Sequence, residues 1–235
     1  MAAILVLWDI DHTLIETHGV GGEIYAEAFR AVTGHPLDEM PSLSGRTEPV
    51  IFREALKAHG IADRQDLYSQ FAGEQARSYA ARADKLRRRG RALPGAADAL
   101  RALADSPDVI QSILTGNTRP AAEIKLRTFA LDRYLDLDVG AYGTDDDDRA
   151  NLVKIARQRA EEGHGVRFDP AATVLIGDTP NDVAAARDGG ARIIAVATGS
   201  DSAEDLASAG ADPVLDDLTQ TDELLSVIYG GQLRK

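Results

Sequence analysis

The sequence predicts an α/β fold, with a Rossmann-like parallel sheet, helices on both faces of that sheet, and an inserted α-helical cap domain. Continuous apolar runs at residues 4–8 and 173–176 are typical of strands buried on both faces of a parallel sheet. From residue 96 onward, helical and strand patterns alternate, as they do when parallel strands are joined by helices. Residues 23–91 show helical patterns only. We therefore expect an α/β core at 1–15 plus 92–235 and a helical cap at 16–91.

At least three helices are expected in the cap. The first carries an apolar stripe over residues 24–32 and ends at Gly34. The second begins after Thr47, which can act as an N-cap, and ends at Gly60. The third carries a stripe over residues 67–86 and ends in consecutive arginines, since cations suit a helix C-terminus.

Glycines make the stretch 16–22 a predicted linker, because they free the backbone from side-chain restrictions. A second hinge is expected at 89–95. The core elements then follow in order: helix 96–104, strand 109–114, helix 120–130, a weak strand at 137–141, helix 149–161, strand 173–176, helix 181–187, strand 193–196, and an edge strand at 213–215.

Composition restricts the partners. The chain has 235 residues with 26 Lys and Arg against 38 Asp and Glu, a formal net charge of −12 that disfavours nucleic acid and anionic membranes. The absence of cysteine excludes disulfides and thiolate chemistry. No apolar run approaches the ~20 residues needed to cross a bilayer. We expect a cytoplasmic protein, a monomer or homodimer, that acts on a small metabolite.

Two carboxylate clusters follow the two apolar strands. Asp9 and Asp11 come after the first strand, and Asp178 and Asp182 come after the second. Ligands of open parallel sheets bind at the carboxyl ends of the strands, where both clusters fall. Two carboxylates ~4 Å apart repel by about 4 kcal/mol at an effective dielectric constant of 20, so the group requires a bound cation. Oxygen ligands of this kind suit Mg²⁺.

Four motifs occur in a characteristic order: Asp9-Ile-Asp11-His-Thr13, Thr115 after a strand, Arg149 at a helix start, and Gly177-Asp178-Thr-Pro-Asn-Asp182. Together with the helical insert, they resemble the haloacid dehalogenase-like superfamily, in its phosphoglycolate phosphatase-like branch. The resemblance implies that Asp9 is a nucleophile that forms an aspartyl-phosphate and that Asp11 is the general acid and base. It also implies that Thr13 braces the loop.

The same resemblance implies the rest of the site. Asp9 and Asp178 would bind Mg²⁺ directly, the backbone carbonyl of Asp11 would join them, and Asp182 would bind directly or through water. Thr115 and the amides of Gly116 and Asn117 would donate hydrogen bonds to phosphoryl oxygens at the head of a helix. Arg149 would face the phosphoryl group as a cation, with Lys154 as the alternative.

Two positions need separate interpretation. His12 stands where the family usually has glycine, and histidine tolerates unusual backbone angles better than most residues. Arg46 lies in a segment, residues 44–47, that resembles a substrate-facing loop of phosphoglycolate phosphatase-like proteins. Arg46 could therefore hold a carboxylate or phosphate of the substrate, or it could simply flank a helix cap.

The expected activity is Mg²⁺-dependent hydrolysis of a small phosphomonoester, phosphoglycolate-like by resemblance. One alternative is a phosphomutase of the β-phosphoglucomutase type, and another is a non-catalytic phosphate-binding regulatory protein. A dehalogenase is disfavoured because it would leave Asp11 and Asp182 without a role. The acidic run at 145–148 lacks the glycine and distal glutamate of a calcium-binding loop and is expected to be solvated.

Overall fold

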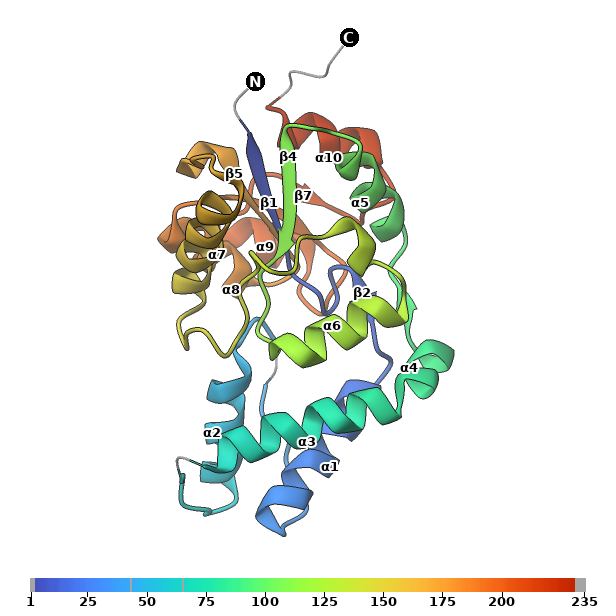
Figure 1. Cartoon of the computed structure of the whole chain (residues 1–235), viewed down its shortest axis with the longest axis vertical. Coiled ribbons are helices and arrows are strands. Elements are labelled where there is room, and N and C mark those ends of the chain that lie inside the picture. Colours follow the sequence, from blue (N-terminus) through green and yellow to red (C-terminus); the bar gives the residue numbers. More distant parts are fainter. Residues whose placement is uncertain (1–2, 43, 65, 231–235) are drawn as a thin grey trace.

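A five-stranded parallel sheet forms the centre of the computed structural model, which describes residues 3–42, 44–64 and 66–230 (Figure 1). The strands lie in the order β4-β1-β5-β6-β7. Their bounds are β1 Ile4–Trp8, β4 Val109–Ile113, β5 Thr173–Gly177, β6 Arg192–Val196 and β7 Val214–Leu215. The α/β architecture predicted from the alternating pattern is thereby confirmed.

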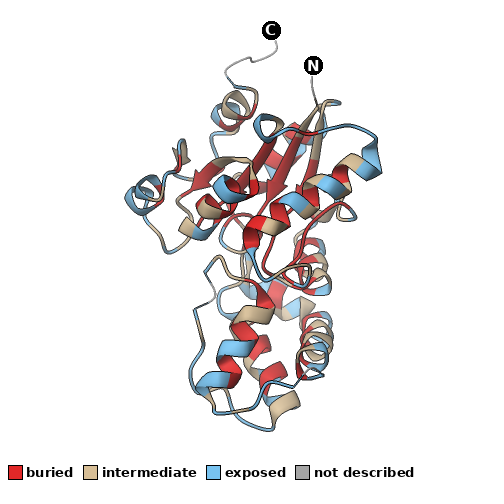
Figure 2. Cartoon of the chain, turned by 90° about the vertical axis from the view of Figure 1, so that its left-hand side faces the viewer, coloured by how far each residue is buried: buried red, intermediate tan, exposed pale blue. Residues whose placement is uncertain are grey.

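The central strand β1 explains why its sequence is continuously apolar. Leu5 and Leu7 point to one face of the sheet, Val6 and Trp8 to the other, and all four are fully buried. A separate apolar cluster packs on each face, so residues 5–8 of the strand are shielded from water. Figure 2 shows this layer of buried strands between helices whose outer sides are exposed.

Helices cover both faces of the sheet. The cluster around Val6 and Trp8 includes residues of three helices, and the cluster around Leu5 and Leu7 includes residues of two others. The first set is α5 Ala96–Ala104, α6 Arg119–Thr128 and α10 Thr221–Ile228; the second is α7 Arg149–His164 and α8 Pro180–Gly189; α9 Ala203–Ser208 packs beside β7. Within the described ranges, no helix combines the length and apolarity needed to cross a membrane.

Four helices form a separate group below the sheet in Figure 1. They are α1 Val20–Thr33, α2 Glu48–Ala58, α3 Leu67–Ala81 and α4 Ala83–Arg89. Their own core is aromatic, with the rings of Phe52 and Phe71 stacked at 4.6 Å between centroids and Tyr25 4.8 Å from Phe71. A second cluster joins these helices to α6 through Ala121.

The two chain segments that connect the groups pair with each other. Strands β2 Ile15–Glu16 and β3 Arg91–Ala92 form a short antiparallel ribbon. Helix α1 already begins at Val20, so the prediction that the whole stretch 16–22 is a linker was wrong. Gly19, with φ +83°, is the residue whose left-handed backbone starts that helix. The domain limits at 15/16 and 91/92 stay a prediction.

Three further expectations needed correction. The predicted third cap helix is two helices, α3 and α4, because the helical conformation is interrupted at Arg82. Residues 137–141 form no strand; a single bridge joins Ala141 to Leu114. Helices α9 and α10 were not predicted, because six and eight residues are too short for a clear periodicity.

Candidate active site

The order of the sheet gathers the sequence motifs at one edge. Asp9 follows β1, which lies between β4 and β5. Thr115 comes two residues after the end of β4, and Asp178 directly follows β5. Trp8 is in register with both Ile113 and Ile176, so the three strands end at the same level. Residues more than 160 positions apart in the chain are therefore neighbours, as in Thr13 Oγ1, which donates a hydrogen bond of 2.9 Å to Asp178 Oδ1.

The loop after β1 turns through His12, whose φ is +62°. This left-handed conformation explains why glycine suits the position and why histidine can replace it. The peptide N–H of His12 donates to the carbonyl of Ile15 at 2.8 Å, which closes the turn. The turn leaves Asp9 buried and Asp11 partly accessible.

Three of the predicted metal ligands lie together. Oxygen atoms of Asp9, Asp178 and Asp182 lie within 4.8 Å of one another, and all three residues are buried. Burial, together with repulsion from Asp182 and Asp11, raises the pKa of Asp9 to about 6 despite the Arg149 guanidinium. Burial and the neighbouring Asp9 raise the pKa of Asp178 to about 8. These carboxylates carry more negative charge than the nearby side chains neutralise, so the donor set fits a divalent cation such as Mg²⁺.

The carboxylate of Asp11 is not part of this group. Lys125 Nζ donates to its two oxygens at 2.8 and 2.7 Å, and Asn117 Nδ2 donates to Oδ2 at 2.7 Å. Burial would raise the pKa of Asp11, but the Lys125 ammonium outweighs it and holds that pKa below its ordinary value. Asp11 is therefore ionised and fixed in orientation at neutral pH.

Asp182 is engaged on both oxygens. Its Oδ1 accepts from Arg149 Nε at 2.9 Å. Its Oδ2 accepts from the amide and hydroxyl of Thr179 at 3.1 and 2.6 Å, which forms a capping box at the start of α8. With both oxygens occupied, Asp182 would contact a metal through water more readily than directly.

Arg149 is the cation at the predicted position. It lies at the first residue of α7, is buried, and places Nη2 3.0 Å from Asp9 Oδ1. Lys154, the alternative, points away from the site; its Nζ lies 3.2 Å from Asn151 Oδ1 at the exposed surface. The helix that carries both residues thus presents only Arg149 to Asp9.

Lys125 was missed by the sequence analysis. It is 3% exposed in the middle of α6, where it also donates to Asn117 Oδ1 at 2.7 Å. The sequence pattern could have predicted that Lys125 is buried, because Lys125 follows Ala121 and Ala122 at helical spacing and so falls on the apolar face of its helix. A lysine on such a face is buried only when it has a charged partner.

The loop after β4 contacts the first turn of α2. Asn117 Nδ2 donates to Thr115 Oγ1 at 2.7 Å, and the peptide N–H of Glu48 donates to the carbonyl of Gly116 at 2.8 Å. A Cβ atom at Gly116 would overlap the carbonyl of Arg46, so only glycine allows this approach. The contact joins the cap helices directly to the sheet edge.

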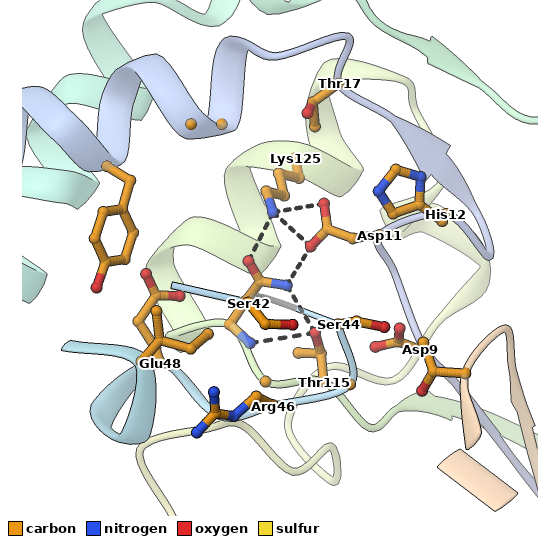
Figure 3. Close-up of a pocket in the computed structure, with 18 of the residues that line it drawn as sticks. Asp9, Asp11, His12, Thr17, Ser42, Ser44, Arg46, Glu48, Thr115 and Lys125 are labelled. Carbon is orange, nitrogen blue, oxygen red and sulfur yellow. Dashed lines mark hydrogen bonds and ion pairs between the residues drawn. The ribbon is translucent and has the colours of Figure 1, made fainter. Parts of the chain in front are cut away.

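A cavity of 330 Å³ extends from the strand ends to the cap helices. Asp9, Asp11, Thr115, Arg149 and Asp178 line one end. Residues of α1, α2 and α3 line the other: Tyr25, Glu48, Ile51, Gln75 and Tyr79. Figure 3 shows Asp9 and Glu48 on opposite sides of the view, with Asp11 and Lys125 above them.

Arg46 also lines the cavity, but a neighbour holds its guanidinium. Nη1 lies 2.6 Å from Glu54 Oε2, and Nη2 pairs with the other oxygen of the same carboxylate. The hydrogen bonds that Arg46 donates to the Glu54 carboxylate raise the pKa of Arg46. In the acidic run, Asp145 pairs with Arg159, Asp147 pairs with Arg53, and Asp148 caps α7, so this loop is more than a solvated segment.

Comparisons with known proteins identify the family and the fold. The family model of the haloacid dehalogenase-like hydrolases matches residues 6–187. No curated protein matches the sequence significantly. A hydrolase from Pseudomonas syringae superimposes with a TM-score of 0.70 at 22% identity, covering 96% of this chain and 99% of its own.

Two other solved structures are similar. One is a predicted phosphoglycolate phosphatase from Haemophilus somnus, with a TM-score of 0.66, 17% identity, and coverage of 95% of this chain and 98% of its own. The other is a putative β-phosphoglucomutase from Thermotoga maritima, with a TM-score of 0.60, 21% identity, and coverage of 97% and 99%. The protein belongs to the haloacid dehalogenase-like hydrolase family, as the sequence motifs predicted.

Proposed function

We propose that this protein is a Mg²⁺-dependent phosphomonoester hydrolase that acts on a small phosphorylated metabolite. The observation that carries the proposal is the arrangement around Asp9. One carboxylate with a free approach from the cavity lies beside a cation, Arg149, and beside two further carboxylates that could hold a metal. This combination suits attack on a phosphoryl group, because the carboxylate can serve as the nucleophile while Arg149 and a metal ion offset the negative charge of the phosphoryl oxygens.

Asp9 would act as the nucleophile. A carboxylate oxygen attacks phosphorus, the bond from phosphorus to the ester oxygen breaks, and the phosphoryl group is held as an aspartyl-phosphate. Arg149, 3.0 Å from Asp9 Oδ1, would attract the phosphoryl oxygens as they approach. Thr115 and the amides of Gly116 and Asn117 line the same end and would donate hydrogen bonds to those oxygens.

Asp11 would transfer the protons. The leaving oxygen takes a proton from Asp11 in the first step, and the attacking water gives a proton to Asp11 in the second, so that the acid is restored. The structure adds a requirement to this scheme, because Lys125 and Asn117 hold Asp11 ionised when no substrate is bound. Substrate binding must therefore loosen the contact to Lys125 before Asp11 can take up the proton that it later donates.

Asp9, Asp178 and the backbone carbonyl of Asp11 would bind the metal directly. Asp182 would bind it through a water molecule. When bound, Mg²⁺ supplies positive charge that screens the nucleophile from the anionic phosphoryl group. The phosphoglycolate-like substrate, the monomeric or homodimeric state, the cytoplasmic location, and the absence of nucleic acid and membrane partners stay predictions.

The test is phosphate release from a panel of small phosphomonoesters, measured with Mg²⁺ and with EDTA. Wild-type protein should release phosphate only with Mg²⁺, and Asp9→Asn should abolish the release because an amide cannot serve as the nucleophile. Asp188→Asn, an exposed aspartate on α8 paired with Arg187, is the matched control and should keep full activity.

Other outcomes would redirect the assignment. Turnover that persists in EDTA would contradict the metal requirement. Isomerisation of a sugar phosphate with little free phosphate would favour the phosphomutase, and tight binding of phosphate without any turnover would favour the regulatory protein.

A further inference from the structure

Hydrogen-bonding atoms without partners mark the cap end of the cavity. In the described part of the chain, three buried side-chain polar atoms lack a partner: Tyr25 Oη, Tyr68 Oη and Gln75 Oε1. Tyr25 and Gln75 line the cavity, whereas Tyr68 does not. A buried polar atom without a partner costs free energy, which a bound ligand can recover by supplying the missing hydrogen bond.

The orientation of Gln75 is fixed by its neighbour. Its Nε2 donates to Glu48 Oε1, so its Oε1 is left as a free acceptor. The reverse orientation of the amide would bring the amide oxygen against the carboxylate. Gln75 is 3% exposed and Glu48 is 7% exposed, so water does not compete freely for either group. Gln75, a residue of the cavity lining, thus carries a buried acceptor without a partner, beside the buried carboxyl group of Glu48.

The cap end is also close to the phosphoryl end. Glu48 is the first residue of α2, and its peptide N–H is bonded to the carbonyl of Gly116 in the loop that carries Thr115. A phosphoryl group at Asp9 would therefore direct the attached leaving group toward Glu48 (Figure 3), and Gln75 belongs to the same cavity lining. The cavity, at 330 Å³, is at the small end of the usual range for ligand pockets of about 300–1,000 Å³.

The described cations that line the cavity are all paired with acids. The pairs are Arg46 with Glu54, Lys125 with Asp11, and Arg149 with Asp9 and Asp182. In the proposed mechanism, Arg149 serves the phosphoryl group and Lys125 serves Asp11, so neither is assigned to a carboxylate of the leaving group. A leaving group with its own carboxylate would meet the Glu48 carboxyl group instead. Burial raises the pKa of Glu48 to about 7, so a second negative charge beside it is disfavoured at and above neutral pH.

We propose that Tyr25, Glu48 and Gln75 form a subsite that binds hydroxyl groups of the leaving group, so that the substrate is the phosphate ester of an uncharged polyol or sugar. Hydroxyl groups can donate to Gln75 Oε1 and to the Glu48 carboxylate and can accept from the Tyr25 hydroxyl. This inference rests on the proposed phosphatase activity, because the phosphoryl group must occupy the Asp9 end.

Glycerol 3-phosphate and 3-phosphoglycerate are a matched pair for the test, since they differ only in a hydroxymethyl group against a carboxylate. We expect kcat/KM for glycerol 3-phosphate to be at least about tenfold higher. Phosphoethanolamine tests whether the subsite instead takes an ammonium group, and it should be the poorer substrate. Equal or better turnover of 3-phosphoglycerate or of phosphoethanolamine would overturn the proposal.

Two tyrosine variants test whether the preference for glycerol 3-phosphate depends on the hydroxyl group of a residue that lines the cavity. Tyr25→Phe should lower kcat/KM for glycerol 3-phosphate about fivefold relative to kcat/KM for 4-nitrophenyl phosphate, which has no hydroxyl on its leaving group. Tyr68→Phe removes a hydroxyl that is equally buried and unpartnered but lies outside the cavity lining, and it should change neither substrate. Neither variant should lower the unfolding temperature, because neither hydroxyl has a partner to lose. The proposal is wrong if both variants affect glycerol 3-phosphate alike.

The subsite and the phosphatase activity can fail separately. Hydrolysis of 4-nitrophenyl phosphate without a preference for glycerol 3-phosphate would disprove the subsite and leave the phosphatase standing. If no ester is hydrolysed, the phosphatase proposal fails, and calorimetric binding of the matched pair to Asp9→Asn with Mg²⁺ still decides the subsite. Tighter binding of glycerol 3-phosphate would support it, and equal or weaker binding would overturn it.

Discussion

The two ends of the cavity differ in how their polar groups are satisfied. At the sheet end, the charged groups hold one another: Arg149 contacts Asp9 and Asp182, and Thr13 contacts Asp178. At the cap end, Tyr25 Oη and Gln75 Oε1 have no partner within the described residues. The sheet end is thus preorganised for one reaction on one kind of group, whereas the cap end leaves hydrogen bonds for the ligand to complete.

This difference matches the origin of the two ends. The sheet end is fixed by strands β1, β4 and β5, whose register leaves the catalytic side chains little freedom. The cap end comes from three helices with their own aromatic core. Substitutions at the sheet end should therefore damage all substrates alike, and those at the cap end should change the preference among substrates.

The largest effect is expected at Arg149. Arg149→Met should lower kcat/KM at least about 100-fold for every ester, because the phosphoryl oxygens lose their cation and Asp9 and Asp182 lose their partner. Arg149→Lys keeps the charge and should recover part of the loss, which distinguishes an electrostatic role from misfolding.

The exposed Lys154→Met on the same helix is the control and should be neutral. If Arg149→Met lowered kcat/KM for only some esters, this would contradict the view that the sheet end acts on all substrates alike and the cap end selects among them.

A smaller effect is expected at Lys125, which lies between the two ends. Lys125→Met should lower kcat about tenfold and raise the pKa of Asp11, because burial then acts without the opposing ammonium. Because the first step needs protonated Asp11, the pH dependence of kcat/KM should show this as a descending limb shifted to higher pH, a change that a merely structural role would not produce.

Arg127→Met removes an exposed cation two residues along the same helix and should leave the pH profile in place. An unshifted profile in Lys125→Met would show that Lys125 does not control the ionisation of Asp11.

The smallest effect concerns stability and metal binding. The folded-state pKa of Asp178 is raised to about 8, so its neutral form stabilises the metal-free fold at low pH, and this contribution is lost as the pH rises from about 4 through 8. Mg²⁺ should bind the ionised carboxylates and restore the stability. The Mg²⁺-induced rise in unfolding temperature, measured by calorimetry, should therefore amount to a few degrees at pH 8 and be smaller at pH 5.5.

Asp178→Asn should remove this pH dependence, and Asp188→Asn should keep it. An equal Mg²⁺ effect at both pH values would indicate that the cation binds elsewhere.

Much of the core was predictable because its signals are local. The apolar run of β1 and the N-terminal position of Arg149 on α7 are as expected from sequence. The expectation of one long helix over residues 67–86 failed because the break at Arg82 has no glycine or proline to mark it. Lys125 and Gln75 were visible as polar residues on apolar helix faces, but their partners, Asp11 and Glu48, belong to other elements.

By itself, the sequence determined the fold class and which acidic residues follow the strand ends, because strand periodicity and short motifs depend on neighbouring residues in the chain. Only the tertiary structure decided that Lys125 forms an ion pair with Asp11 and that Arg46 forms one with Glu54. It also decided that the amide oxygen of Gln75 has no hydrogen-bond partner. Such pairings follow from distances between elements and from the loss of water around them, which no local pattern specifies.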